Sequence, residues 1–294
     1  MPSQPGLGQI NQLHVDAIAN GGIRLDCSQL EDHGLSIPDF VVLPQNECTE
    51  PVQIGDSLEV MLYLNSSNDL IATTVKPDIQ VGECAFLKVV STSQYGAFLD
   101  WGLPKDLLLP HSEQSYPVRV GKSYVVYAYL DEKSGKVACS TMLHFHLSEE
   151  ANHWLKKGQQ VELLIASKSD LGFKAVIDGH SLGLIFHEEL SQPLNFGDRI
   201  KGWIKNIRED GRIDLSINTL DAKTRDVLSQ TILEKIKLSG GKLALSDKSS
   251  PEDIYREFKV SKKNFKRAIS GLYKQRMIHI EPEYIELIND QADG

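Results

Sequence analysis

Two aromatic side chains flank a glycine near the middle of the chain, Tyr95 and Phe98 on either side of Gly96-Ala97. On a twisted strand bent at a glycine, residues three apart can present both rings on one exposed face. Exposed rings on a small β-structure stack unpaired bases, at about 1–3 kcal/mol per base. The alternative for Phe98 is a core position, because it alternates with Leu99. The pattern predicts a base-stacking platform.

A second candidate surface is a run of cations, because residues 256–276 hold eight basic residues and one acid, Glu257. Phe265, Ile269 and Leu272 mark the apolar stripe of a helix. We interpret the helix as one that presents cations to phosphate or to a groove, the alternative being a helix that is basic only for solubility. The cations that we select are Lys262, Lys263, Lys266 and Arg267.

A third cationic stretch lies at residues 199–205, where three cations and Trp203 fall at period two, opposite Ile200 and Ile204. This stripe is either a surface that follows phosphates or, as we favour, a solvated face or domain contact. The cations are Arg199, Lys201 and Lys205.

A histidine-rich connector, residues 142–154, contains metal-ligating residue types in His144, His146, His153 and Glu149. Alternation brings only the first two histidines to one side, and only if the segment is extended. We favour a solvated linker and predict no metal site.

The elements that must position these residues occur three times. Gly55–Thr74, Gly121–Ser140 and Gly197–Ser216 each contain a glycine, an alternating run, a polar turn and a shorter alternating run. The turn residue falls 14 positions after the glycine in every copy, and the closing hydroxyl 19. Period-two alternation around a polar turn predicts a β-hairpin. A register kept three times indicates tandem modules of roughly 65 residues.

A second glycine pair, 14 residues apart, precedes each hairpin. The first glycine of that pair lies 39 residues before the hairpin glycine in copies two and three, and 47 before it in copy one. The first copy therefore carries an eight-residue insertion, which we place within Leu30 to Asp39.

After Leu220 the pattern becomes helical. We predict a helix over 224–238, a short strand over 242–245, a helix capped by Ser250 and a third helix capped by Ser261. A terminal hairpin turns around Pro282-Glu283. This order predicts a winged helix-turn-helix.

The net charge of −9 is unevenly distributed, with +2 after Leu220 and −11 in residues 1–220. An acidic chain with concentrated cations predicts modest, salt-sensitive binding to nucleic acid. Acidic modules also suit protein partners. No apolar run reaches the roughly 18 residues of a membrane helix, and the start lacks the features of a signal peptide.

Four scattered cysteines form no C-x-x-C pair, and we expect reduced thiols in a cytoplasmic protein. They are Cys27, Cys48, Cys84 and Cys139.

The repeat, with its YGAFLDWGLPKDLLLP and KGWIKNIREDGRIDLS segments, resembles the RNA-binding OB-fold repeat of ribosomal protein S-one. With SKKNFKRAISGLYKQRMI in the tail, the whole chain resembles the bacterial conserved virulence factor B family, of the YitL type. The resemblance implies a mainly β, multidomain protein. Three tandem five-stranded OB barrels (1–77, 78–143 and 144–220, the last including the linker) precede a C-terminal α+β winged-helix domain (221–294). It also implies RNA binding and post-transcriptional regulation of gene expression.

The resemblance also implies which residues form the RNA face. Its two ring positions correspond to Tyr95 and Phe98, and in module three to Leu171 and Lys174. Its usual histidine falls at Phe186 in module three. Its basic residue before the last strand corresponds to Lys136 and Arg212, and His111 lies one residue beyond the usual histidine. Module two thus retains most of the implied face and module one little.

No catalytic motif is present, so we expect no enzyme activity and no cofactor. We expect a binder of single-stranded RNA, with two alternatives left open. One is a DNA-binding transcription regulator that uses the winged helix, and the other is a protein-binding adaptor that uses the acidic modules.

Overall fold

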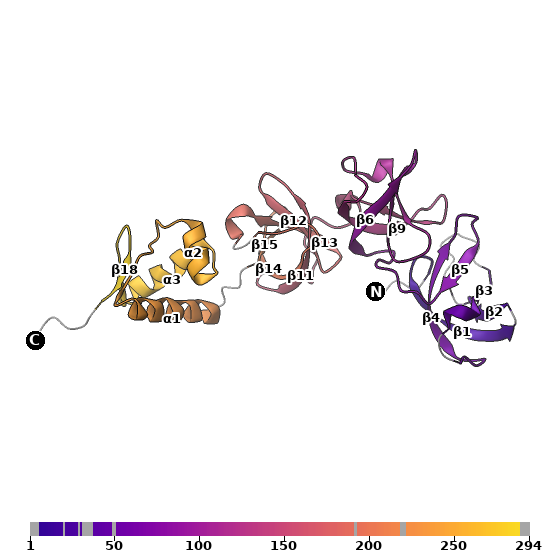
Figure 1. Ribbon diagram of the computed structural model, residues 1–294, viewed down its shortest axis with the longest axis horizontal. Coiled ribbons are helices and arrows are strands. Elements are labelled where there is room, and N and C mark those ends of the chain that lie inside the picture. The colour runs from indigo at the N-terminus through magenta and orange to yellow at the C-terminus, as the bar shows by residue number, and fades with distance from the viewer. Residues whose placement is uncertain are drawn as a thin grey trace, which may run out of the picture. The chain divides into compact units, whose positions relative to one another are not determined.

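The computed structural model describes residues 6–19, 21–28, 30, 38–48, 51–190, 193–217 and 222–288. Three five-stranded β-barrels precede a helical domain (Figure 1). By contact density the chain divides into two compact units, Met1–Ser148 with barrels one and two, and Glu149–Gly294 with barrel three and the helical domain.

Each barrel follows the predicted repeat. The strands of barrel one are β1 (Ile10–Ala19), β2 (Gly22–Asp26), β3 (Phe40–Leu43), β4 (Ser57–Leu64) and β5 (Leu70–Thr73). Those of barrel two are β6 (Cys84–Thr92), β7 (Gly96–Leu99), β8 (Leu107–Pro110), β9 (Ser123–Leu130) and β10 (Val137–Ser140). Those of barrel three are β11 (Gln160–Lys168), β12 (Gly172–Ile177), β13 (Ser181–Phe186), β14 (Arg199–Ile207) and β15 (Ile213–Ser216).

Barrels two and three close by pairing the third strand with the fifth in parallel, with Leu108 opposite Ala138 in barrel two. In barrel one the hydrogen-bonded order is β3-β2-β1-β4-β5, so the third strand β3 and the fifth strand β5 are not paired with each other. A 3₁₀ turn follows the third strand of each barrel, at Gln45–Glu47, His111–Glu113 and His187–Glu189. The prediction of three tandem five-stranded modules is confirmed. The predicted insertion lies within Leu30 to Asp39, of which residues 31–37 lie outside the described residues.

The second glycine marker explains how the second strand begins. Gly96 opens β7 at φ 154°, and a Cβ added there would lie 2.2 Å from the carbonyl oxygen of Leu109 on β8. The same holds for Gly172 in barrel three, where an added Cβ would lie 2.0 Å from the carbonyl oxygen of Ile185. The two strands therefore approach too closely for any side chain, which keeps the exit of the third strand beside the start of the second.

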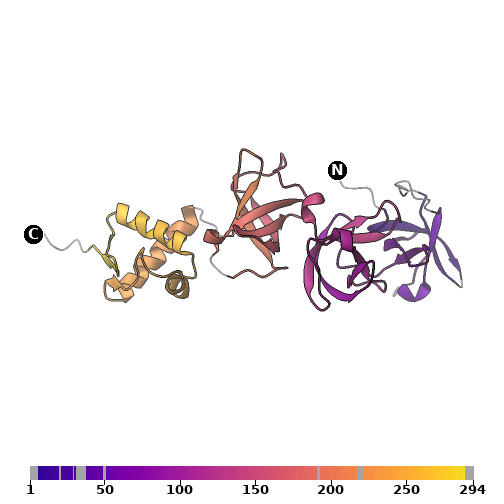
Figure 2. The same cartoon turned by 90° about the horizontal axis from the view of Figure 1, so that it is seen from above.

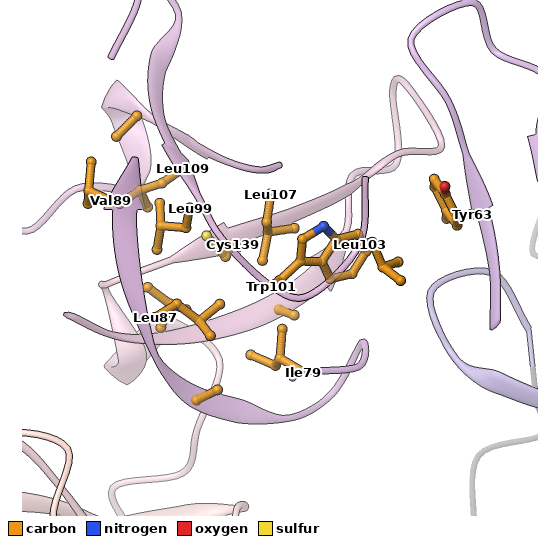
Figure 3. Packing of buried hydrophobic residues seen from close by; sticks show 14 of the residues in the cluster. Tyr63, Ile79, Leu87, Val89, Leu99, Trp101, Leu103, Leu107, Leu109 and Cys139 are labelled. Carbon is orange, nitrogen blue, oxygen red and sulfur yellow. The ribbon is translucent and has the colours of Figure 1, made fainter. Parts of the chain in front are cut away.

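Barrel one has a core of its own, and residues of its strand β4 also join the core cluster of barrel two. Met61 and Tyr63 of β4 pack with the core of barrel two, and Trp101 meets Tyr63 edge to face at 6.3 Å (Figure 3). The Trp101 indole donates to the carbonyl of Lys105 at 2.5 Å. Apolar burial of this kind makes the two barrels one packed body.

Polar contacts reinforce this joint. Lys105 Nζ donates to Leu64 O at 3.0 Å, and the amide of Val81 donates to Gly8 O at 2.8 Å. Burial, with a smaller contribution from Lys136, lowers the pKa of Lys105. A Cβ on Gly8 would lie 2.2 Å from Val81, so the chain passes between the barrels without spare room.

Replacing Trp101 with alanine is expected to destabilise both barrels together. A buried Trp-to-Ala change costs about 3–5 kcal/mol, and Trp101 is 2% exposed. Hydrogen exchange should accelerate in β4 and β5 as well as in β6 to β10. Acceleration confined to barrel two would contradict a shared core.

The C-terminal domain contains α1 (Ala222–Leu238), β16 (Lys242–Leu243), α2 (Pro251–Phe258), α3 (Lys262–Lys274), β17 (Ile278–Ile280) and β18 (Ile285–Leu287). Figure 2 shows its three helices gathered together. Ser250 and Ser261 cap α2 and α3 as predicted, accepting from the amides of Asp253 at 3.1 Å and Asn264 at 3.3 Å. Phe265, fully buried, lies at the centre of the core. The winged helix-turn-helix is confirmed.

Candidate nucleic-acid interface

The predicted platform of barrel two lies at the start of β7. Tyr95 is 68% exposed, and Phe98 is half-buried on the outer side of β7, because Ala97 and Leu99 face the core. Phe98 pairs across the sheet with Leu108 of β8. An exposed ring and a half-exposed ring three residues apart on one barrel can stack unpaired bases.

His111 lies against the same loop. Its backbone amide donates to Tyr95 O at 3.2 Å, and its Nε2 lies 3.2 Å from Ser93 O. Ser93 N in turn donates to Gly96 O at 2.8 Å. These bonds hold the loop that carries Tyr95, so the structure brings His111 against Tyr95, and Phe98 lies three residues further along the chain in β7.

Lys136 is directed elsewhere. Its ammonium approaches Ser66 O of barrel one at 3.4 Å, and its side chain is half-buried. Lys136 belongs to the margin between barrels one and two, and its role in RNA binding stays a prediction.

Barrel three carries a groove of about 400 Å³ on its outer face. Lys174 of β12 and Arg212 before β15, both predicted site residues, line it together with Arg208. Its apolar surface includes Leu171, which is 60% exposed at the position that Tyr95 has in barrel two, and Leu184. Cations around an apolar floor suit a base with its phosphate.

Phe186, also predicted, ends β13 and is half-buried under two cations. Lys205 Nζ lies 5.9 Å from its ring centroid and Arg208 Cζ 5.5 Å. Arg208 also pairs with Asp214 through Nε at 2.8 Å and Nη2 at 2.7 Å. The hydrogen bond to Asp214 raises the pKa of Arg208, which keeps that guanidinium charged and fixed beside the groove. Of the predicted cationic stripe, Arg199 and Lys201 are exposed.

The connector is not simply solvated, and our prediction of a solvated linker is wrong. Leu143 and Leu147 are buried, and the His146 ring stacks on Tyr127 at 4.7 Å and on Tyr129 at 5.2 Å. The leucines four residues apart are the signal that sequence reasoning passed over. Burial, followed by nearby Glu113, raises the pKa of Tyr129 to about 12.

Helix α3 presents the predicted cations on its outer side. Lys266 and Arg267 are exposed, and Lys262 and Lys263 are half-buried in the first turn. Lys262 Nζ lies 3.5 Å from Lys248 O, and Lys266 Nζ lies 3.5 Å from Asp247. The turn between β17 and β18 instead exposes Glu281 and Glu283. The domain therefore has one cationic helix and an acidic wing.

No helix in the described part of the chain is long and apolar enough to cross a membrane. Among the same residues, no three side chains are grouped as a metal would require. All four cysteines are free thiols, and three of them are buried.

Comparison with known proteins agrees with this architecture. Residues 7–75 match the S1 domain, and residues 230–287 match the CvfB-like winged helix domain. Both are nucleic-acid-binding types of domain.

The chain is 30% identical to conserved virulence factor B of Staphylococcus epidermidis, over 85% of this chain and 86% of that protein. It is 29% identical to uncharacterized protein YitL of Bacillus subtilis, over 83% and 84%. A crystal structure of a multidomain protein with nucleic acid binding domains from Streptococcus pneumoniae is 21% identical, with a TM-score of 0.39, over 96% of this chain and 98% of that one.

Proposed function

Because the chain belongs to the conserved virulence factor B family, we propose that it is an RNA-binding regulatory protein acting on single-stranded RNA. The observation that carries the proposal is the pair Tyr95 and Phe98, of which the first is 68% exposed. Stacking on ring faces requires unpaired bases, which single strands offer and duplexes withhold.

Cations elsewhere in the chain would hold the sugar–phosphate backbone. The groove of barrel three supplies Lys174 and Arg212, and α3 supplies Lys263 and Arg267. Barrel one is assigned no RNA contact, because residues 1–77 hold ten acids and two basic residues, Arg24 and Lys76. That negative charge repels phosphate. We therefore restrict the alternative function, binding of a protein partner, to barrel one.

The duplex-DNA alternative has less support. A winged helix that straddles a duplex brings its wing near phosphates, and here the turn at Glu281 and Glu283 is acidic. Like charges at contact distance are unfavourable. The cationic helix can still contact a flexible single strand that avoids the wing.

We propose that the protein binds RNA without catalysing a reaction and acts in post-transcriptional control. We also propose that it acts in the cytoplasm, where free thiols such as Cys27 stay reduced. Burial raises the pKa of Cys27 to about 11, which suits an inert interior thiol rather than a nucleophile.

A filter-binding assay tests the proposal by comparing the affinity for a labelled single-stranded RNA with the affinity for duplex DNA of the same sequence. We expect the single strand to bind more tightly, with affinity falling as salt rises from 50 to 200 mM. Replacing Lys263 and Arg267 with alanine should reduce the salt slope by about 1.4, since each phosphate contact to a single strand contributes about 0.7.

The matched control is alanine at the exposed pair Lys156 and Lys157, which line neither the groove of barrel three nor the hollow beside α3. That variant should leave the slope unchanged. Tighter binding of the duplex would instead support the DNA-binding alternative.

A further inference from the structure

The second half of the connector lies on barrel three, against the groove. The amide of Ala151 donates to Gly211 O at 2.9 Å, and Glu150 forms an antiparallel bridge with Arg212. A Cβ on Gly211 would lie 3.1 Å from the Glu150 side chain, so the segment packs closely on the hairpin turn. Residues 149–151 are therefore fixed beside the cations of the groove.

Glu149 is the residue of this segment that enters the lining. Its Oε1 lies 3.0 Å from Lys174 Nζ. Lys174 lies on β12 at the position that Phe98 has in barrel two, and it faces the same groove as Arg212. A carboxylate thus already occupies one side of the ammonium that a backbone phosphate would approach.

A carboxylate and a phosphodiester bind an ammonium group in the same way. Both are anions that accept charge-assisted hydrogen bonds, and two anions near one cation repel each other. RNA can use Lys174 only by displacing Glu149 or by sharing the ammonium with it. We propose that Glu149 is a built-in competitor for phosphate, which lowers the affinity of the barrel-three groove for RNA. This inference rests on the proposed RNA-binding function.

The strength of the ion pair fits a competitor rather than a permanent block. The side chains of Lys174 and Glu149 are 46% and 40% exposed. Ion pairs this exposed contribute up to about 1 kcal/mol, which corresponds to about fivefold in affinity. An RNA that makes further contacts can displace such a carboxylate, whereas an isolated phosphate gains little.

The experiment is RNA binding by the full chain carrying Glu149→Gln, a substitution that removes the charge and keeps the shape. Affinity for a single-stranded RNA should rise about two- to fivefold. In a Lys174→Gln background the same substitution should have no effect, because the contested cation is gone. Glu162→Gln is the matched control, an exposed carboxylate of β11 outside the groove. It should leave affinity unchanged.

A second readout does not depend on RNA. Acetylation of Lys174 by an amine reagent, followed by mass spectrometry, should be faster in Glu149→Gln than in the wild type. Unchanged or weaker RNA binding by Glu149→Gln, or an equal gain in Glu162→Gln, would overturn the inference while leaving RNA binding intact. A wild type that binds no RNA would defeat the proposed function instead. The acetylation rate would then still show whether Glu149 forms an ion pair with Lys174.

Discussion

Replacing Gly96 with alanine is expected to cost barrel two about 4 kcal/mol or more of stability. The added Cβ would lie 2.2 Å from Leu109 O and 2.8 Å from Pro110 Cα, both backbone atoms that cannot rotate away. The φ of 154° adds strain for any residue with a side chain. Losses above about 4 kcal/mol are exceptional for a single substitution, and strain at a special backbone conformation is one of the few mechanisms that produce them.

The measurement is native-state hydrogen exchange of the β7 and β8 amides in the full chain. Gly82→Ala is the matched control, because Gly82 has φ 94° in the same barrel with nothing within 4 Å of the added Cβ. We expect that control to lose only about 1–2 kcal/mol from backbone strain. Equal losses in the two variants would show that the strand contact at Gly96 is not what fixes this pair of strands.

Replacing Tyr95 with alanine and Phe98 with leucine is expected to weaken RNA binding about 30-fold or more. Each stacked base contributes about 1–3 kcal/mol, so two rings contribute at least about 2 kcal/mol. Leucine at position 98 keeps the apolar contact with Leu108 while removing the ring, which limits the loss of stability. Calorimetric titration with single-stranded RNA provides the affinity.

Tyr116→Ala is the control for this pair. Tyr116 is 52% exposed on the same barrel, and its ring centroid lies 6.0 Å from that of Tyr124 on β9. It should bind RNA as the wild type does. An RNA affinity that survives the double substitution would exclude barrel two as the stacking site.

The repeated glycines account for how much of the fold was predictable. Gly96 and Gly172 each mark a strand contact that no other residue allows, so spacing alone located the second strand in both barrels. Ser250 and Ser261 similarly marked two helix starts through local hydrogen bonds. The capping signal depends on neighbours in sequence and the glycine signal on a repeated spacing, so both can be recognised without coordinates.

The site was less predictable, because its details depend on contacts between distant segments. Nothing near Lys136 in sequence indicates that its ammonium meets Ser66, 70 residues earlier. Arg208 follows β14, yet its guanidinium lies over the ring of Phe186, which ends β13 and is 22 residues earlier in the chain. Glu149 was assigned to a solvated linker, since the packing of that linker on barrel three has no period that a pattern would reveal.

The position of Trp101 has an optical consequence. The chain has three tryptophans, and Trp101 is the one within residues 1–148. Being 2% exposed in the cluster shared by barrels one and two, its indole should emit at short wavelength, whereas Trp154, 53% exposed, should emit as in water. In a variant with Trp154 and Trp203 replaced by phenylalanine, the emission wavelength of Trp101 would therefore report whether the first two barrels are packed together.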